Sequence, residues 1–409
     1  MIPRTIEASV RESLTQWPVT LITGARQVGK STLCSIIQAD TGYNYVSLDN
    51  PRDRHLAISD PSLFLKKHPC PLIIDEVQYA PGLFDEIECI VNKEKYEKGN
   101  NYGMFILTGS HVYNLMQGVT QSLAGRVNII EMSPLSMSEI CGVEEKPFTV
   151  DVQRVIDRTS KHVIEPLELY EKICRGMYPE LHNNKKIDTE TFYRNYVETY
   201  LDRDVSMLIN VHDKTKFFDF LSILASMTGQ ELVYETVAKA LGVTAKTVKS
   251  WVSVLVTGHI VRLVQPFYDT SMIKRIVRHS KIYFTDTGLA CYLMGLDAKT
   301  LEKGIYKGRL VETYIVNEIM KSYDNNLVGC RFFHYRDRSS NEIDLLLLRN
   351  AKLTLVECKS GVMFSKKDVK AFSQLKSSSY EIGDSCLICN TDTIYPLDKG
   401  VYAIPITSI

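Results

Sequence analysis

The sequence predicts an α/β protein built in three parts, and three observations support that fold class. Over residues 1–140, short apolar runs alternate with helical patterns, which is typical of a parallel sheet with helices packed on it. Over residues 150–290, apolar side chains recur every three or four positions, which indicates helices. Over residues 300–409, a helical stretch is followed by further strand patterns. We therefore expect one domain in each of these three ranges.

Five apolar runs are the predicted strands of the first domain. They cover residues 19–23, 43–48, 72–75, 104–108 and 127–131. After them Pro134, Gly142 and Pro147 interrupt the alternation of strand and helix patterns. The first domain is therefore expected to end near residue 140.

The composition excludes several other classes of protein. The 409 residues are 44% hydrophobic and 23% charged, which is the makeup of a globular protein and not of a disordered, collagen-like or coiled-coil chain. The 48 basic and 48 acidic residues cancel, so the chain is no polycation, although one domain could still carry a basic patch. No apolar run approaches the roughly 18–20 residues of a membrane span, so we expect no membrane partner.

The cysteines and the N-terminus predict a cytoplasmic location. Ten cysteines are too sparse for a disulfide scaffold. Cys386 and Cys389 have CxxC spacing, but no second pair or histidine accompanies them, so buried apolar cysteines are expected instead of a zinc or redox site. The N-terminal stretch MIPRTIEASVRESL lacks the apolar core of a signal peptide.

A phosphate-binding motif follows the first predicted strand. Residues 24–31, Gly-Ala-Arg-Gln-Val-Gly-Lys-Ser, match G-x-x-x-x-G-K-[ST] between an apolar run and a helical pattern. Backbone N–H groups of such a loop surround phosphates, and the helix N-terminus adds a positive end. Lys30 would reach the β- and γ-phosphates, and Ser31 would hold Mg²⁺. This predicts a P-loop NTPase sheet and ATP with Mg²⁺ as cofactors, held by Gly24, Ala25, Arg26, Gln27, Val28, Gly29, Lys30, Ser31 and Thr32.

Two acids end the third predicted strand. The run Pro71-Leu-Ile-Ile-Asp75-Glu76 is a buried strand pattern followed by carboxylates, as in a Walker B motif. Asp75 would anchor Mg²⁺ through water, and Glu76 would orient and deprotonate the attacking water. The strand at 43–48, between the loop and Asp75 in the chain, fits the P-loop class that carries a catalytic glutamate.

Two further polar features are candidates for the same site. The strand at 104–108 ends in hydroxyls, and Ser110 or Thr108 would sense the γ-phosphate. Arg126 follows a glycine and precedes a strand, so it could contact the γ-phosphate in its own subunit or act as an arginine finger on a neighbour. A structural salt bridge is the alternative for Arg126. With Lys30 and Glu76, Arg126 completes the expected catalytic set, and its finger role would imply a homo-oligomer.

These residues resemble a known family. The segments GARQVGKSTL, LIIDEVQ, LTGS and SLAGR, and later Gly176-Met-Tyr-Pro-Glu, Tyr200-Leu-Asp-Arg-Asp, Tyr283-Phe-Thr-Asp-Thr-Gly-Leu, Glu342-Ile-Asp and Glu357-Cys-Lys, look like the AAA-type ATPases of bacteria and archaea with a C-terminal domain of unknown function. The resemblance spans nearly the whole chain. It implies ATP binding and hydrolysis, a winged-helix middle domain and a C-terminal nuclease-like fold.

The middle domain contains a predicted helix-turn-helix. Residues 232–241 and 244–255 form two helical patterns joined at Gly242, with Thr244 as the N-cap of the second. Runs at 260–263 and 281–284 would form the strands of a wing. Outward-facing basic residues could hold DNA phosphates, or the helices could only pack and act as a lever; the basic set is Lys246, Lys249, Lys274, Arg275, Arg278 and Lys281.

The third domain carries carboxylates and a lysine on a predicted hairpin. A helix at 310–323 and a strand at 331–335 precede strands at 342–348 and 353–358. Alternate side chains of a strand share a face, so Glu357 and Lys359 point the same way, and pairing brings Asp344 beside them. Glu312 on the preceding helix could close the group. Two carboxylates on Mg²⁺ beside a lysine is the chemistry of phosphodiester hydrolysis, and Asp344, Glu357 and Lys359 resemble a PD-(D/E)xK nuclease site.

Two functions remain open from the sequence. In the first, ATP hydrolysis controls a winged-helix and nuclease-like module that acts on DNA. In the second, the protein is an ATP-dependent switch with protein partners, and its C-terminal acids bind nucleic acid or only pack. Glu76 favours turnover over simple nucleotide binding, because a pure sensor needs no base.

Overall fold

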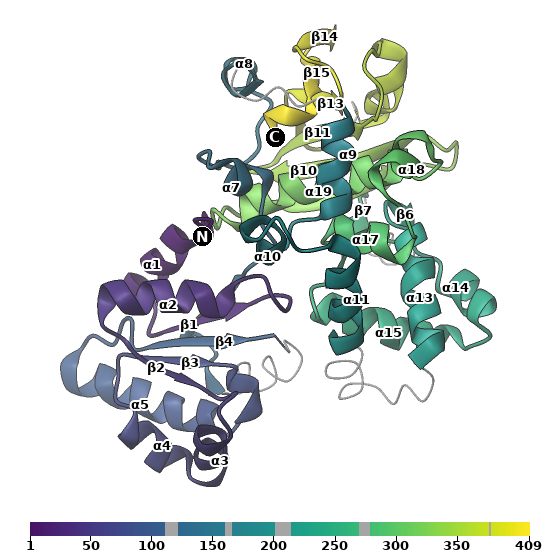
Figure 1. Ribbon diagram of the computed structural model, residues 1–409. Coiled ribbons are helices and arrows are strands. Elements are labelled where there is room, and N and C mark those ends of the chain that lie inside the picture. The colour runs from purple at the N-terminus through teal and green to yellow at the C-terminus, as the bar shows by residue number, and fades with distance from the viewer. Residues whose placement is uncertain (111–121, 160–165, 201–213, 270–278, 376–377) are drawn as a thin grey trace.

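A computed structural model describes residues 1–110, 122–159, 166–200, 214–269, 279–375 and 378–409 (Figure 1). In Figure 1 the N-terminal sheet and its helices form one half of the molecule, and the helical region and a second sheet form the other. Among the described residues, no helix combines the length and the apolar character needed to cross a membrane. All ten cysteines are free thiols, and Cys386 and Cys389 are buried in one strand.

The first sheet contains five parallel strands in the order β2-β3-β4-β1-β5. Their bounds are β1 Val19–Thr23, β2 Asn44–Ser47, β3 Leu72–Asp75, β4 Phe105–Gly109 and β5 Val127–Glu131. Each predicted strand is present, with ends that differ by at most one residue. The strand that separates β1 from β3 in space is β4, whereas β2, which lies between them in the chain, forms the edge of the sheet.

Helices cover both faces of this sheet (Figure 1). They are α1 Ile6–Gln16, α2 Lys30–Thr41, α3 Pro51–Ser59, α4 Pro61–Lys67 and α5 Leu83–Lys98. Alternate residues of a strand pack into two hydrophobic cores, one on each face of the sheet. Ile22 packs in the core with α1 and α2, and Leu21 packs in the core with α3, α4 and α5. The strands β1, β3 and β4 are buried on both faces and have no solvent-facing side, which is why these runs are mainly apolar.

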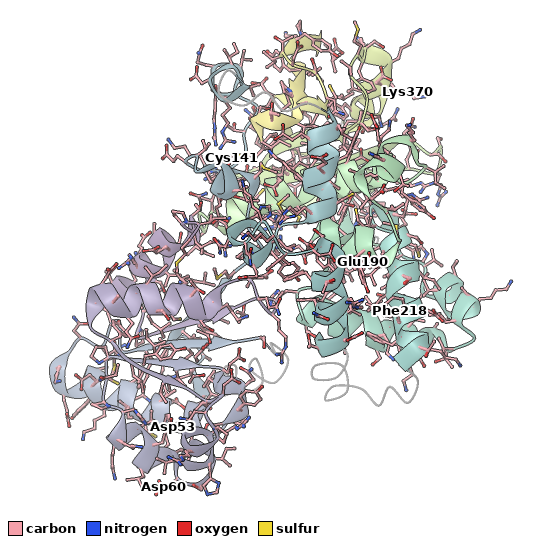
Figure 2. The ribbon with its side chains drawn as sticks, in the orientation of Figure 1. Asp53, Asp60, Cys141, Glu190, Phe218 and Lys370 are labelled. Atoms are coloured by element: carbon pink, nitrogen blue, oxygen red, sulfur yellow. The ribbon has the colours of Figure 1, made fainter. Side chains whose placement is uncertain are left out.

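The middle region is mostly helical. Its elements are α7 Met137–Cys141, α8 Val152–Thr159, α9 Pro166–Arg175, α10 Pro179–Asn183, α11 Thr189–Tyr200, α13 Lys214–Ser226, β6 Gln230–Glu231, α14 Tyr234–Leu241, α15 Ala245–Thr257, β7 Val261–Pro266, β8 Lys281–Phe284 and α17 Thr287–Leu293. Glu190, labelled in Figure 2, marks the first turn of α11.

The predicted helix pair and strand pair both form. Gly242, in the left-handed conformation, ends α14, and the Thr244 hydroxyl caps α15 by accepting from Thr247 N at 3.1 Å. β7 and β8 pair antiparallel. Lys246 and Lys249 are exposed on α15 as expected. The expectation is wrong for Lys281, which is 1% exposed. Lys274, Arg275 and Arg278 lie outside the described residues.

The C-terminal region forms a second sheet around one long helix. Its elements are α18 Ala298–Lys303, α19 Lys307–Asp324, β9 Arg331–Arg336, β10 Glu342–Arg349, β11 Lys352–Cys358, η3 Lys366–Leu375, β12 Glu381–Ile382, β13 Ser385–Cys389, β14 Tyr395–Asp398 and β15 Val401–Pro405. The hairpin β10–β11 turns through Asn350 and Ala351, both at positive φ, as a tight two-residue turn requires.

This second sheet continues into the middle region. Its order is β14-β15-β13-β11-β10-β9-β7-β8-β6, because β7 pairs in parallel with β9 through Gln265 and Phe333. The sheet therefore crosses the boundary expected between residues 290 and 300.

A partly buried ion network joins the three regions. The Arg262 guanidinium on β7 lies 3.0 Å from Glu131 Oε1 on β5 and 2.8 Å from Asp324 Oδ2 at the end of α19. His259 Nδ1 also lies 3.0 Å from Glu131 Oε1. Burial opposes the charge of Glu131, but the Arg262 and His259 contacts outweigh it and hold its pKa well below the ordinary value. The N-terminal sheet is thus tied to the other half of the molecule by ionised side chains.

Candidate nucleotide site and C-terminal acid cluster

The predicted phosphate loop connects β1 to α2. Gly24 and Gly29 have φ of 143° and 100°, and a Cβ on Gly24 would lie 2.2 Å from the carbonyl oxygen of Met132. Only glycine fits there, because the chain passes directly against β5's extension. Lys30, the first residue of α2, is buried and its Nζ donates to the carbonyls of Gly24 and Ala25, both at 2.8 Å. The loop therefore holds its own cation at its centre.

Gly24→Ala is expected to destabilise the protein and weaken nucleotide binding, since the new methyl group displaces either the loop or Met132. The matched control is Gly42→Ala: Gly42 is also at positive φ, but nothing lies within 4 Å of its Cβ position. In the control, the free energy of unfolding should fall by about 1 kcal/mol because of the left-handed backbone alone. In Gly24→Ala it should fall by about 1–3 kcal/mol more because of overpacking. Urea unfolding and binding of a fluorescent ATP analogue measure both effects; equal losses in the two variants would contradict the close approach.

The predicted metal-anchoring acid ends β3. Asp75 is buried, and its Oδ2 accepts from the Tyr45 hydroxyl at 2.8 Å. Its Oδ1 accepts from the Thr108 hydroxyl, which comes from the neighbouring strand β4. Burial and the hydrogen bond to Asp75 raise the pKa of Tyr45 well above its ordinary value, so Tyr45 remains a donor. The Asp75 carboxylate is thereby fixed in orientation.

The predicted base lies one residue further on. Glu76 adopts the left-handed conformation, with φ of 58°, and its amide donates to the Thr108 hydroxyl at 3.2 Å. Its Oε2 accepts from Ser110 Oγ at 3.4 Å and from the Gln78 side chain. The two sensor candidates therefore contact different carboxylates: the Thr108 hydroxyl donates to that of Asp75, and the Ser110 hydroxyl to that of Glu76.

A cavity of about 870 Å³ opens between the loop and the helical region. One wall consists of Arg26, Gln27, Gly29, Lys30, Ser31, Thr32 and Glu76. The opposite wall comes from α10, α11 and the turn between them, and consists of Pro179, Glu180, Asn183, Ile187, Thr191, Phe192, Asn195, Tyr196 and Thr199. Of the other predicted loop residues, Ala25 and Val28 turn their side chains into the core. Only their backbone is available to a ligand.

Arg126 lies against α5 instead of this cavity. Its Nε donates to Asn92 at 2.8 Å, and its Nη2 lies 3.2 Å from Glu88 Oε1. This is the structural salt bridge considered as the alternative. A finger role for Arg126 stays a prediction for an assembly of subunits.

Arg4 braces the phosphate loop and was not anticipated. Its guanidinium donates to the carbonyls of Val28 at 2.6 Å and Ser133 at 2.7 Å, and to Glu139 Oε1 at 3.1 Å. These contacts span 24, 129 and 135 positions of the chain. No local pattern could have identified this residue.

Two segments of the family resemblance meet behind the second wall. Asp286 is buried, and it accepts from the Met177 amide at 2.6 Å and from the Tyr193 hydroxyl at 2.7 Å. A Cβ on Gly176 would lie 2.0 Å from the same hydroxyl. These contacts around Asp286 fix the turn that places Pro179 at the cavity. The segment after Tyr200, which also belongs to the resemblance, lies outside the described residues.

The predicted C-terminal residues do come together. Asp344 on β10, Glu357 on β11 and Glu312 on α19 are all buried. Asp344 Oδ2 accepts from the Cys358 amide at 2.9 Å, and Glu357 Oε1 accepts from Lys359 Nζ at 2.6 Å.

An additional lysine lies inside this cluster. Lys281 Nζ, from β8, lies 2.8 Å from Glu312 Oε1, 2.6 Å from Glu342 Oε1 and 3.1 Å from Asp344 Oδ1. The Tyr283 hydroxyl also donates to Glu312 Oε1, at 2.7 Å. Lys281 was predicted to lie on the surface, since the position of β8 relative to α19 and β10 cannot be read from the sequence.

Burial and neighbouring charges shift the pKa values of the ionisable groups in this cluster. Burial, and then the neighbouring Asp344, raise the pKa of Glu312 to about 7 and that of Glu357 to about 8. Burial opposes the charge on Lys281, but the attraction of Glu312 and the other acids raises its pKa well above the ordinary value. In the described part of the chain, no three His, Cys, Asp or Glu side chains are arranged to hold a metal ion.

Comparisons with protein families cover most of the chain. Residues 16–141 match a family described as an AAA domain. Residues 307–409 match a domain of unknown function, DUF4143, and residues 167–300 match another, DUF8612. The first match, with the five-stranded parallel sheet, gives the N-terminal region an AAA-type P-loop ATPase fold.

The chain is also similar to whole relatives and to solved structures. Uncharacterized proteins of Mycobacterium bovis and Mycobacterium tuberculosis are each 26% identical over 407 residues, covering 99% of this chain and 84% of theirs. A Walker-type ATPase of Pyrococcus abyssi matches at a TM-score of 0.42 with 16% identity, covering 70% of this chain and 94% of its own. A Signal Transduction ATPase with Numerous Domains from Pyrococcus horikoshii matches at 0.28 with 11% identity, covering 80% and 48%.

Proposed function

We propose that this chain, which carries an AAA domain ahead of a C-terminal domain of unknown function, binds ATP with Mg²⁺ and hydrolyses it. One observation carries the proposal: Glu76 lines the same cavity as Lys30 and Ser31 of the phosphate loop. A nucleotide-binding loop alone would serve a sensor, whereas an adjacent carboxylate supplies the base that hydrolysis needs.

The residues divide into binding and chemical roles. Backbone N–H groups of the loop would surround the phosphates, and Lys30 would exchange its two carbonyl acceptors for charged phosphate oxygens, which accept stronger hydrogen bonds. Ser31 and Asp75 would hold Mg²⁺, which neutralises charge on the phosphates when bound. Glu76 would take the proton of the attacking water. Ser110 and Gln78 orient its carboxylate.

The second wall of the cavity supports a coupling function. A ligand in the cavity would contact α10 and α11 as well as the loop. Because α11 is packed on α17 through Tyr193 and Asp286, a change at the phosphates would reach the helical region. We infer that the nucleotide state sets the position of the helical and C-terminal regions relative to the N-terminal sheet.

We favour DNA as the partner on which this motion acts, because the exposed Lys246 and Lys249 on α15 can contact DNA phosphates. A protein partner is the second candidate, as is a neighbouring subunit contacted by Arg126. Ten free thiols suit a reducing compartment, and we place the protein in the cytoplasm.

The test is phosphate release from ATP with Mg²⁺, with and without linear duplex DNA, at two salt concentrations. We expect turnover, raised by DNA at low salt and less so at high salt, since phosphate contacts weaken as salt rises. Turnover that ignores DNA would favour the protein-partner candidate. Absence of turnover under all conditions would refute the ATPase proposal.

A further inference from the structure

The C-terminal acid cluster is organised around an ammonium group. Glu312, Glu342 and Asp344, from α19 and β10, converge on Lys281 Nζ at 2.8, 2.6 and 3.1 Å. An ammonium has three N–H donors, and three carboxylates are the full complement it can satisfy. Lys281 is 1% exposed, so water does not compete for these contacts.

The position of this ammonium is set by strand pairing. Lys281 is the first residue of β8 and lies opposite Val264 on β7 and Glu231 on β6. Its backbone is therefore held on both sides by neighbouring strands. The side chain enters the cluster from the middle region, whereas the acids belong to the C-terminal region.

The acids are already occupied by donors. Asp344 accepts from the Cys358 amide with one oxygen and from Lys281 with the other, and Glu357 accepts from Lys359. A divalent ion such as Mg²⁺ needs a near-octahedral set of oxygen ligands with free lone pairs. A dication among these acids would also face two ammonium groups at close range. The residues therefore do not fit the metal that a nuclease-like site implies.

We propose that Lys281 takes the place of a divalent metal in this cluster. The site is then a metal-independent cluster of ion pairs that holds β8 against α19 and β10, and it does not cleave phosphodiesters. Lys359 corresponds to the lysine of the nuclease pattern, so Lys281 is a second cation that the pattern lacks. In this cluster Lys281 is a positioning residue, because it holds the middle region against the acids of the C-terminal region.

Mn²⁺ binding tests the proposal, measured by the loss of the electron paramagnetic resonance signal of free Mn²⁺ without nucleotide. All proteins carry Lys30→Ala, which removes the phosphate-loop lysine. This background is expected to show no saturable Mn²⁺ site up to millimolar concentration. Adding Lys281→Met, which keeps the length of the side chain and removes its charge, should create one site.

The matched control is Lys321→Met. Lys321 is also a buried lysine, but it contacts a single carboxylate, Glu318, and the carbonyl of Leu135. It should therefore create no Mn²⁺ site. A folded Lys281→Met protein without a new site would overturn the proposal.

A second comparison does not depend on the folding of Lys281→Met. If the Lys30→Ala background binds one Mn²⁺ and Asp344→Asn abolishes that binding, the cluster is a metal site and the proposal fails. If neither protein binds Mn²⁺, the ammonium assignment stands. The result is independent of ATP turnover, because the two sites share no residue.

Discussion

Replacing Lys30 with alanine is expected to abolish ATP binding at micromolar concentrations. Lys30 is buried at the centre of the phosphate loop, where its Nζ donates two hydrogen bonds of 2.8 Å. With a nucleotide bound, those donors would meet phosphate oxygens, and hydrogen bonds to charged groups contribute about 1.5–3 kcal/mol each. Loss of two such bonds corresponds to roughly a hundredfold to ten-thousandfold loss of affinity.

Isothermal titration of ATP with Mg²⁺ measures this effect. Lys30→Met is the companion variant, because it keeps most of the buried side chain and removes the charge. Both variants should lose affinity to a similar extent, and circular dichroism should show that both are folded. A folded Lys30→Ala protein with wild-type ATP affinity would sink the phosphate-loop assignment.

Glu76→Gln is expected to bind ATP normally and to lose turnover by about a hundredfold to ten-thousandfold, the usual contribution of a general base. Glutamine has nearly the same shape and still accepts from Ser110, so the wall of the cavity is preserved. It cannot take a proton from water. Binding and chemistry should therefore separate.

Single-turnover phosphate release, with ATP affinity measured in parallel, checks this prediction. Glu94→Gln on α5 is the control, because it makes the same chemical change at a carboxylate whose partner is Lys98, outside the cavity. The control should keep wild-type turnover. Equal rates for Glu76→Gln and the wild type would move the base to another residue.

Local sequence predicted the parts of the nucleotide site that local chemistry determines. The loop from Gly24 to Ser31 and the strand that ends at Asp75 are continuous segments, and each element has a recognisable composition. Thr108 and Ser110 were predicted as alternatives for one sensor, but only the pairing of β3 with β4 decides which carboxylate each hydroxyl contacts. That pairing depends on strand order, which no single segment encodes.

The rest of the site depends on contacts between distant segments. The Arg4 brace and the α11 wall arise when separate parts of the chain pack together, and neither has a signal of its own. Lys281 is the clearest case. Alternation places it on a strand face, but whether that face meets solvent or three acids depends on how β8 lies against α19 and β10. The sequence alone favoured the solvent, which was wrong.

The pairing of β7 with β9 has a practical consequence for dissecting this protein into fragments. A fragment that begins near residue 300 would start beyond β7 and leave the β9 edge, including Phe333, without its partner. Unpaired edges of this kind recruit other chains and aggregate. A fragment that ends near 290 would leave Lys281 without its acids. Recombinant work should therefore keep both regions on one polypeptide, because β7 and β9 belong to one hydrogen-bonded sheet.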